Sequence, residues 1–156
     1  MTVELKAGDA APDFDMAADG GGRVRLADFA GKALVLYFYP KDDTSGCTNE
    51  AKGFTEQAAA FAKAGTAMVG ASKDSVKSHD RFKAKYGLTF PLGSDADGVV
   101  VEAYGVWVEK SLYGRKYMGI DRSTFLIGPD GRIARTWRKV KVPGHVAEVL
   151  AAAQAL

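Results

Sequence analysis

The sequence predicts an α/β fold in which helices flank a central mixed sheet. Two observations favour this class. A continuous apolar run over 33–39, closed by Pro40, is typical of a strand buried on both faces of a mainly parallel sheet. Segments with apolar residues at helical spacing then alternate with short strand-like segments. With 156 residues, 47% of them apolar, the chain has the length of one domain, 1–156, and can bury a core.

The expected elements follow in chain order. An opening hairpin pairs 14–17 with 23–26 across a glycine-rich turn, and the strand 33–39 lies at the centre of the sheet. Apolar residues at helical spacing predict a long helix over about 46–64, which Gly65 ends. The remaining elements are a strand over 67–72, a helix over 75–86, a hairpin of 124–127 with 133–137, and a closing helix over 146–156.

The charge balance argues against nucleic acid or anionic lipid as a main partner. Lys and Arg number 21 and Asp and Glu number 19, which leaves a formal net charge of +2. The longest apolar run, 33–39, is far shorter than the ~20 residues of a membrane-spanning helix. We therefore expect no nucleic-acid partner and no membrane partner.

Two features indicate a reducing compartment. Cys47 is the only cysteine, so no disulfide forms within the chain, and a secreted protein seldom leaves a lone thiol unpaired. The first 15 residues carry several charged side chains and lack the apolar core of a secretory signal. We therefore expect the protein in the cytoplasm.

The segment 37–50 carries most of the functional signal, because it runs from a buried strand into a helix, at an edge of α/β sheets where ligands bind. Cys47 falls in the first helical turn, where free backbone N–H groups and the helix dipole favour an anion. Such a thiol should ionise readily. The alternative is a small buried hydrophobe, the commoner role of a single cysteine. Thr44 has a hydroxyl able to bond toward the sulfur, or it is a plain helix N-cap.

The motif Pro40-x-x-x-Thr44-x-x-Cys47 resembles the active-site motif of peroxiredoxins. The segments 37–41 and 46–48 are similar to the Q-type branch, also called bacterioferritin comigratory proteins. Two further segments, 75–80 and 119–127, agree in order and spacing, so the resemblance covers nearly the whole chain. It implies a thioredoxin-like fold with an N-terminal β-hairpin, and reduction of hydrogen peroxide or organic hydroperoxides by the cysteine.

The resemblance also implies a role for each site residue. Cys47 attacks the peroxide as a thiolate and becomes a sulfenic acid. The donors that place the peroxide and stabilise its leaving oxygen are the Thr44 hydroxyl, the Cys47 backbone N–H and the Arg122 guanidinium. Without the resemblance, Arg122 would be assigned to a solvated ion pair.

Three other residues have supporting roles. Pro40 shapes the loop and shields the sulfur, although a simple strand terminator fits it nearly as well. Gly46 belongs to the matched motif. Glu50, three residues after Cys47, holds Arg122 in place or complements the helix dipole. No metal, haem, flavin or nicotinamide cofactor is expected on this chain.

The sequence departs from the family pattern at three positions. Ser45 stands where relatives often have proline, which should make the loop more flexible, although a serine can still cap the helix. Lys52 and Lys83 stand where Q-type enzymes commonly carry a resolving cysteine. A one-cysteine peroxiredoxin needs an external thiol reductant: thioredoxin, glutaredoxin, glutathione or another low-molecular-weight thiol.

Two alternatives to the enzyme remain open. The chain either relays the oxidation of Cys47 to a partner protein without sustained turnover, or is a redox-inert scaffold. Of the two histidines, His79 lies on an apolar helix stripe and is expected to be a partly buried structural residue, whereas His145 is expected to be exposed. Related Q-type proteins are often monomers, and we expect the same here.

Overall fold

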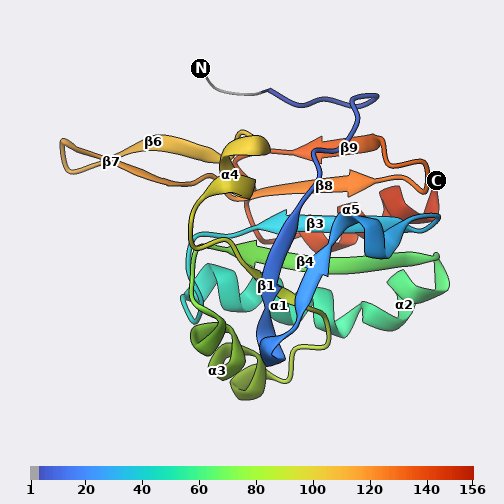
Figure 1. The fold of residues 1–156 in the computed structure, drawn as a ribbon, viewed down its shortest axis with the longest axis horizontal. Helices are drawn as coiled ribbons and strands as arrows, with labels where there is room; N and C mark the ends of the chain where they lie inside the picture. Colours follow the sequence, from blue (N-terminus) through green and yellow to red (C-terminus); the bar gives the residue numbers. More distant parts are fainter. Residues whose placement is uncertain (1–3) are drawn as a thin grey trace.

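The structure, a computed structural model, describes residues 4–156. Within this range the main sheet contains β1 (Asp15–Ala18), β2 (Arg23–Arg25), β3 (Ala33–Phe38), β4 (Thr66–Ser72), β5 (Leu92–Ser94), β8 (Ser123–Ile127) and β9 (Ile133–Trp137). The strands lie in the order β2-β1-β5-β4-β3-β8-β9. Figure 1 shows β9, β8 and β3 side by side in this order. β3 pairs in parallel with β4 and antiparallel with β8, which confirms the predicted central mixed sheet.

Both predicted hairpins are confirmed. β1 pairs antiparallel with β2, and their turn contains η1 (Asp19–Gly21), where Gly20 has a φ of 78° that favours glycine. β8 pairs antiparallel with β9. At the turn between them, the Gly131 N–H donates to the Gly128 carbonyl at 3.0 Å, as the expected tight turn requires.

β3 lies at the centre of the sheet because both of its faces are apolar. Every residue from Ala33 to Phe38 is buried. Val35 and Tyr37 pack into the cluster formed with α1 and α2, whereas Leu36 and Phe38 pack into the cluster on the opposite face. Each large side chain that is fully buried contributes about 1.5–3 kcal/mol of transfer free energy, so this strand anchors both layers of the core.

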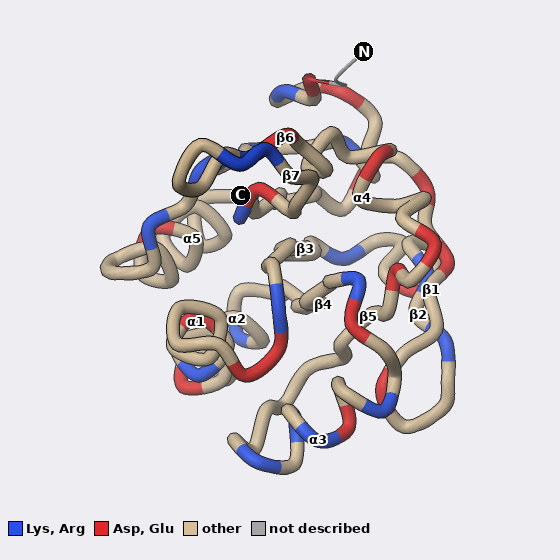
Figure 2. Tube along the Cα trace, turned by 90° about the vertical axis from the view of Figure 1, so that its left-hand side faces the viewer, with Lys and Arg blue, Asp and Glu red and all other residues tan. Residues whose placement is uncertain are grey.

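The helices are α1 (Ser45–Glu56), α2 (Ala58–Lys63), α3 (Val76–Tyr86), α4 (Val99–Ala103) and α5 (His145–Gln154). Figure 2 shows α1, α2 and α5 on one side of the sheet and α4 on the other. The prediction of one continuous helix over 46–64 is wrong. The helix is interrupted at Gln57, whose φ and ψ are −99° and 9°, although neither proline nor glycine stands there.

α3 confirms the predicted helix over 75–86. Ser75 is its N-cap and accepts a hydrogen bond from the backbone N–H of Ser78 at 3.1 Å. Gly87 ends the helix in the left-handed conformation, with a φ of 64°, as expected of a glycine at this position. His79 and Phe82 face inward and are buried.

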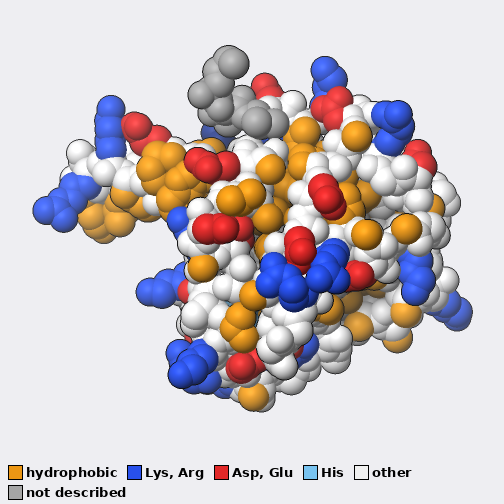
Figure 3. Space-filling model, in the orientation of Figure 1, with side chains coloured by type: hydrophobic (Ala, Val, Ile, Leu, Met, Phe, Trp, Pro, Cys, Tyr) orange, Lys and Arg blue, Asp and Glu red, His pale blue; other side chains and the backbone are white. Residues whose placement is uncertain are grey.

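The sequence interpretation missed β5, α4 and a second hairpin of β6 (Trp107–Leu112) with β7 (Arg115–Ile120). The β6–β7 hairpin projects from the body of the molecule (Figure 1) and exposes apolar and basic side chains (Figure 3). Its exposed large apolar residues are Leu112, Tyr113, Tyr117 and Met118. Within residues 4–156, the longest apolar stretches of helix all fall short of what a bilayer crossing requires.

Candidate active site

The strand register brings two distant segments together at one edge of the sheet. Phe38, the last residue of β3, lies opposite Ser123, the first residue of β8. The chain leaves β3 through the loop 39–44 and begins α1 at Ser45. Because β8 runs antiparallel to β3, Arg122 lies at the same edge as this loop. The pairing of β3 with β8 therefore places Arg122 beside the start of α1.

Cys47 lies in the first turn of α1 and is 1% exposed, so the fold shields its sulfur from most of the solvent. Arg122 Nη2 donates to Cys47 Sγ at 3.2 Å. A permanently charged guanidinium that donates to sulfur stabilises negative charge that develops there. The first-turn N–H groups of α1 add positive potential at the same place. The expected cysteine nucleophile thus lies in a site built for an anion.

Glu50 holds the other side of the guanidinium. Arg122 Nη1 donates to Glu50 Oε1 at 2.7 Å, and the Glu50 side chain is completely buried. Burial raises the pKa of Glu50 to about 7, although Arg122 opposes this shift. Burial by itself would lower the pKa of Arg122, but the negative charges of Glu50 and Cys47 outweigh it and raise the pKa. Arg122 is therefore a partly buried cation, 16% exposed and oriented by two partners, and not a freely solvated one.

Gly46 makes room for the guanidinium. A Cβ atom at this position would lie 3.2 Å from Arg122 Nη2, which is tighter than nine in ten such contacts, so the guanidinium would have to shift. Any larger residue at 46 would press on the nitrogen that donates to the sulfur. The lack of a side chain at Gly46 thus leaves the space that the Arg122 guanidinium occupies.

Thr44 is the N-cap residue of α1, and its carbonyl accepts from the Thr48 N–H at 2.8 Å. Its side chain makes no capping bond. The hydroxyl donates to the carbonyl of Lys41 at 2.8 Å, so its proton is directed toward the loop and not toward the sulfur as expected. Pro40 is exposed just after β3.

The three departures from the family pattern have clear places in the fold. Ser45 is the first residue of α1 and not its cap, which is the helical position where a proline is well tolerated. Lys52 is exposed on α1, as expected. Lys83, on α3, pairs with Asp19 of η1 at 2.7 Å.

The sequence interpretation missed two groups beside the site. Tyr37 stacks on Phe54 of α1, with ring centroids 4.8 Å apart. Burial, followed by the negative charges of Glu50 and Cys47, raises the pKa of Tyr37 well above its ordinary value, so this phenol stays neutral. Asp42, in the loop between β3 and α1, pairs with the buried His79 of α3. The polar triplet 41–43 in a short loop was the available signal.

His145 is not exposed, so that prediction is wrong. It is 3% exposed, and its Nε2 lies 2.8 Å from Thr124 Oγ1 of β8. The rings of Phe54 and Trp137 enclose it at centroid distances of 6.2 and 5.7 Å. Burial lowers the pKa of His145 to about 4, which makes it a neutral core residue at physiological pH. In the described part of the chain, 4–156, no cluster of three or more His, Cys, Asp or Glu residues is arranged to hold a metal ion.

Comparison with known proteins agrees with this site. Residues 7–136 match the AhpC/TSA family. The chain is 53% identical over 150 residues to the putative peroxiredoxin Bcp of Coxiella burnetii, covering 96% of this chain and 98% of that protein. A peroxiredoxin Q structure from Xanthomonas campestris superposes with a TM-score of 0.90 at 48% identity, covering 96% of this chain and 97% of that one.

A second structure is that of a Xanthomonas campestris bacterioferritin comigratory protein whose alkyl peroxide reduction activity was studied. It is 47% identical with a TM-score of 0.89, covering 99% of this chain and 98% of that one. These relatives confirm the thioredoxin-like fold that the sequence predicts. The chain therefore belongs to the AhpC/TSA family and is a Bcp-type, or Q-type, peroxiredoxin: a thiol-dependent peroxidase with a single cysteine.

Proposed function

We propose that the Cys47 thiolate reduces hydrogen peroxide and organic hydroperoxides and becomes a sulfenic acid. The sulfur attacks one peroxide oxygen, so an S–O bond forms while the O–O bond breaks. The bonding electron pair stays on the distal oxygen, which takes up a proton and leaves as water or an alcohol. The observation that carries the proposal is Arg122, which donates to Cys47 Sγ while Glu50 fixes its other nitrogen.

Arg122 contributes more than ionisation of the thiol. An ordinary cysteine, with a pKa of about 8.5, is about 5 to 10% thiolate at pH ~7.4, so complete ionisation gains little more than about tenfold. The remaining acceleration must come from placing the peroxide and stabilising the charge that moves onto its leaving oxygen. A guanidinium already beside the sulfur can donate to that oxygen with little reorganisation.

Thr44 supplies the complementary contact. Its proton is engaged by the Lys41 carbonyl, which leaves the lone pairs of its oxygen free to accept the hydrogen of a hydroperoxide. The Cys47 N–H, in the first turn of α1, has no acceptor within the helix and can donate to the peroxide. Pro40 and Gly46 act indirectly, Pro40 through the shape of the loop and Gly46 through the space it leaves for Arg122.

An external thiol completes the cycle because Cys47 is the only cysteine. One thiol condenses with the sulfenic acid to give a mixed disulfide and water, and a second thiol releases reduced Cys47 and a disulfide. We propose thioredoxin, glutaredoxin or a low-molecular-weight thiol such as glutathione as the donor. We also propose that the protein works as a monomer, as one domain over 1–156, in the cytoplasm.

The same single cysteine favours a second candidate, a relay that passes its oxidation to a partner protein. Without an internal thiol to capture it, the sulfenic acid persists until another molecule reacts with it. A relay of this kind oxidises once per chain and forms a mixed disulfide with one specific protein. It does not sustain turnover on small thiols.

Steady-state peroxide consumption with separate thiol donors distinguishes the two functions. Thioredoxin with its reductase, glutaredoxin with glutathione, and glutathione alone are tested with the Cys47→Ser variant as the blank. The peroxidase predicts many turnovers with at least one donor and none in the variant. A single oxidation per chain with every donor would reject the peroxidase cycle in favour of the relay.

A further inference from the structure

The loop between β3 and α1 is tied to α3 by two neighbouring carboxylates. Asp42 turns inward and is 8% exposed, whereas Asp43 turns outward. Asp43 accepts hydrogen bonds from Lys85 and Tyr86 of α3. It holds a φ of 58°, a left-handed conformation that is uncommon for a residue other than glycine. Contacts with α3 therefore help to hold the conformation of this loop.

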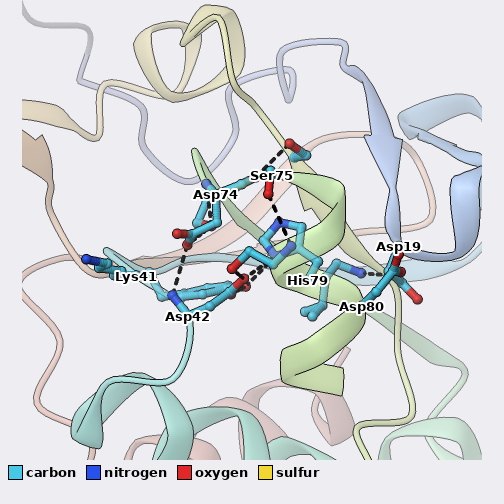
Figure 4. A network of polar contacts seen from close by, with 12 residues as sticks. Asp19, Lys41, Asp42, Asp74, Ser75, His79 and Asp80 are labelled. Carbon is cyan, nitrogen blue, oxygen red and sulfur yellow. Dashed lines mark hydrogen bonds and ion pairs between the residues drawn. The ribbon is translucent and has the colours of Figure 1, made fainter. Parts of the chain in front are cut away.

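Asp42 has three side-chain partners, one in its own loop and two in α3. Tyr39 donates to its Oδ1 at 2.6 Å, and Ser78 donates to its Oδ2 at 2.8 Å. His79 Nδ1 lies 2.7 Å from the same Oδ2. Figure 4 shows Asp42 and His79 pointing toward each other from the loop and from α3. The two hydroxyl donors, one on each carboxyl oxygen, favour the ionised form of Asp42, which can only accept hydrogen bonds.

The two ring nitrogens of His79 both face acceptors. Nε2 lies 2.9 Å from the backbone carbonyl of Gly93 in β5, which can only accept a hydrogen bond. Nδ1 faces the Asp42 carboxylate, which also only accepts. With Asp42 ionised, both nitrogens therefore carry a hydrogen. Opposite an ionised Asp42, His79 is thus an imidazolium, completely buried, that joins the loop to β5 through α3.

The charged and titratable groups around His79 are consistent with this state. Burial would lower the pKa of His79, but the hydrogen bond and charge of Asp42 outweigh it and raise the pKa, with Asp74 adding in the same direction. Burial would raise the pKa of Asp42, but hydrogen bonds from His79 and Tyr39 lower it. Asp74 also accepts from the Asp42 backbone N–H at 2.9 Å and from Ser72 at 2.7 Å.

We propose that His79, as the imidazolium, is a positioning residue that holds the loop 39–44 against α3 and so keeps Thr44 and Cys47 in the arrangement that receives the peroxide. This proposal rests on the peroxidase function proposed above. Thr44 hydrogen-bonds to Lys41 of the same loop, and α1 begins immediately after Thr44. A shift of about 1 Å in such a loop costs about 100-fold in rate when reacting atoms must be aligned.

Two substitutions distinguish the effect of the His79–Asp42 hydrogen bond from the effect of burying any polar side chain at position 79. In His79→Asn the amide nitrogen takes the place of Nδ1 and keeps a donor for Asp42, but it loses the donor for Gly93. In His79→Gln the amide nitrogen takes the place of Nε2, with the opposite result. If the hydrogen bond between His79 and Asp42 positions the loop, the rate of Cys47 oxidation by peroxide should fall about 10- to 100-fold in His79→Gln and clearly less in His79→Asn.

The rate of a second reaction of the same thiol distinguishes positioning of the peroxide from a general loss of structure. Alkylation of Cys47 by iodoacetamide needs the thiolate but no positioned peroxide. We expect its rate in His79→Gln to be unchanged or increased while peroxide oxidation falls. Tyr104→Phe is the matched control, because it removes a buried hydrogen bond, to the Pro12 carbonyl at 2.6 Å, in the other core cluster. Rates are corrected for the folded fraction measured by denaturant unfolding.

Nitrogen chemical shifts of the two histidines test the charge state directly. At about one pH unit above the ordinary imidazole pKa, His79 should still have both ring nitrogens protonated in the wild-type protein, while His145 is neutral. In Asp42→Asn, His79 should lose its proton at lower pH, because the carboxylate that favours the imidazolium is gone. A wild-type His79 that is already neutral at this pH would overturn the proposal.

The measured rates also test whether His79 positions the loop. Equal peroxide rates in wild type, His79→Gln and Tyr104→Phe would overturn the positioning role while leaving the peroxidase intact. A parallel fall of oxidation and alkylation that follows the folded fraction would do the same. A wild-type protein no faster with peroxide than free cysteine would instead reject the peroxidase function itself, whatever the state of His79.

Discussion

Arg122 Nη2 lies 3.2 Å from Cys47 Sγ, although 75 residues separate the two in sequence. The contact depends on the antiparallel pairing of β3 with β8, which sets the residue before β8 beside the helix that follows β3. The same guanidinium is held by Glu50, one turn further along α1. A cation fixed in this way lies beside the sulfur and is available to the leaving oxygen of a peroxide.

Replacing Arg122 with methionine should slow Cys47 oxidation by about 10²- to 10³-fold, the usual cost of removing one donor to a developing negative charge. The second-order rate constant with hydrogen peroxide is measured at high pH, where the thiolate is fully formed in both proteins. Arg135→Met is the matched control, since it removes the same charge from an exposed ion pair with Glu148. A defect that disappears at high pH would show that Arg122 only promotes ionisation.

Replacing Thr44 with valine should slow oxidation by about tenfold or more, because the oxygen that accepts the hydrogen of the peroxide is lost while the side chain keeps its shape. Thr44→Ser, which keeps the hydroxyl, should restore most of the rate. Both variants are compared by competition for peroxide with a reference thiol peroxidase. Equal rates for the valine and serine variants would reduce Thr44 to a helix-terminal residue.

Glu50 should make the protein less stable as the pH rises. Its pKa is raised from 4.5 to about 7 in the fold, so its contribution is fully present below pH 4.5 and is lost as the pH rises through about 7. In Glu50→Gln this loss is absent. The free energy of unfolding of the variant minus that of wild type should therefore increase by about 3 kcal/mol across this window. Denaturant unfolding at a series of pH values measures it, and a flat difference would contradict burial of an ionisable Glu50.

His145 should make the protein less stable as the pH falls. Its pKa is lowered from 6.5 to about 4, so the stability that it contributes is present above pH 6.5 and is lost as the pH falls toward 4. His145→Gln keeps a group able to bond to Thr124 but does not titrate. Wild type should lose about 3 kcal/mol relative to this variant between these pH values. The same unfolding series tests it, and a parallel dependence in both proteins would place the histidine in solvent.

The parts of the site that are local in sequence were predictable. The run 33–39 is apolar on both faces, so it had to be a central strand, and the polar loop after it had to meet a helix that begins near Cys47. Arg122 was different. Its neighbours in sequence, Asp121 and Ser123, suggest a solvated ion pair, and only the resemblance to peroxiredoxins indicated its role before the strand register became known.

The missed features depend on tertiary contacts that leave no periodic pattern. β5 has three residues and is ordered by pairing with β4 and β1. The strands β6 and β7 are mostly exposed, so no buried face marks them in the sequence. His145 begins a helix, usually an exposed position, but the rings of Phe54 and Trp137 enclose it. Asp42 and His79 form a pair only because α3 folds back against the loop.

The central claim is that the site around Cys47 accelerates the breaking of an O–O bond well beyond what an isolated thiol achieves. Reduced protein is mixed with equimolar hydrogen peroxide, samples are quenched at intervals, and their intact masses are measured by mass spectrometry. A parallel reaction with N-acetylcysteine is followed under the same conditions. We predict that Cys47 gains one oxygen before a detectable fraction of the small thiol is oxidised. A Cys47 that remains reduced when half of the small thiol has reacted would contradict the account.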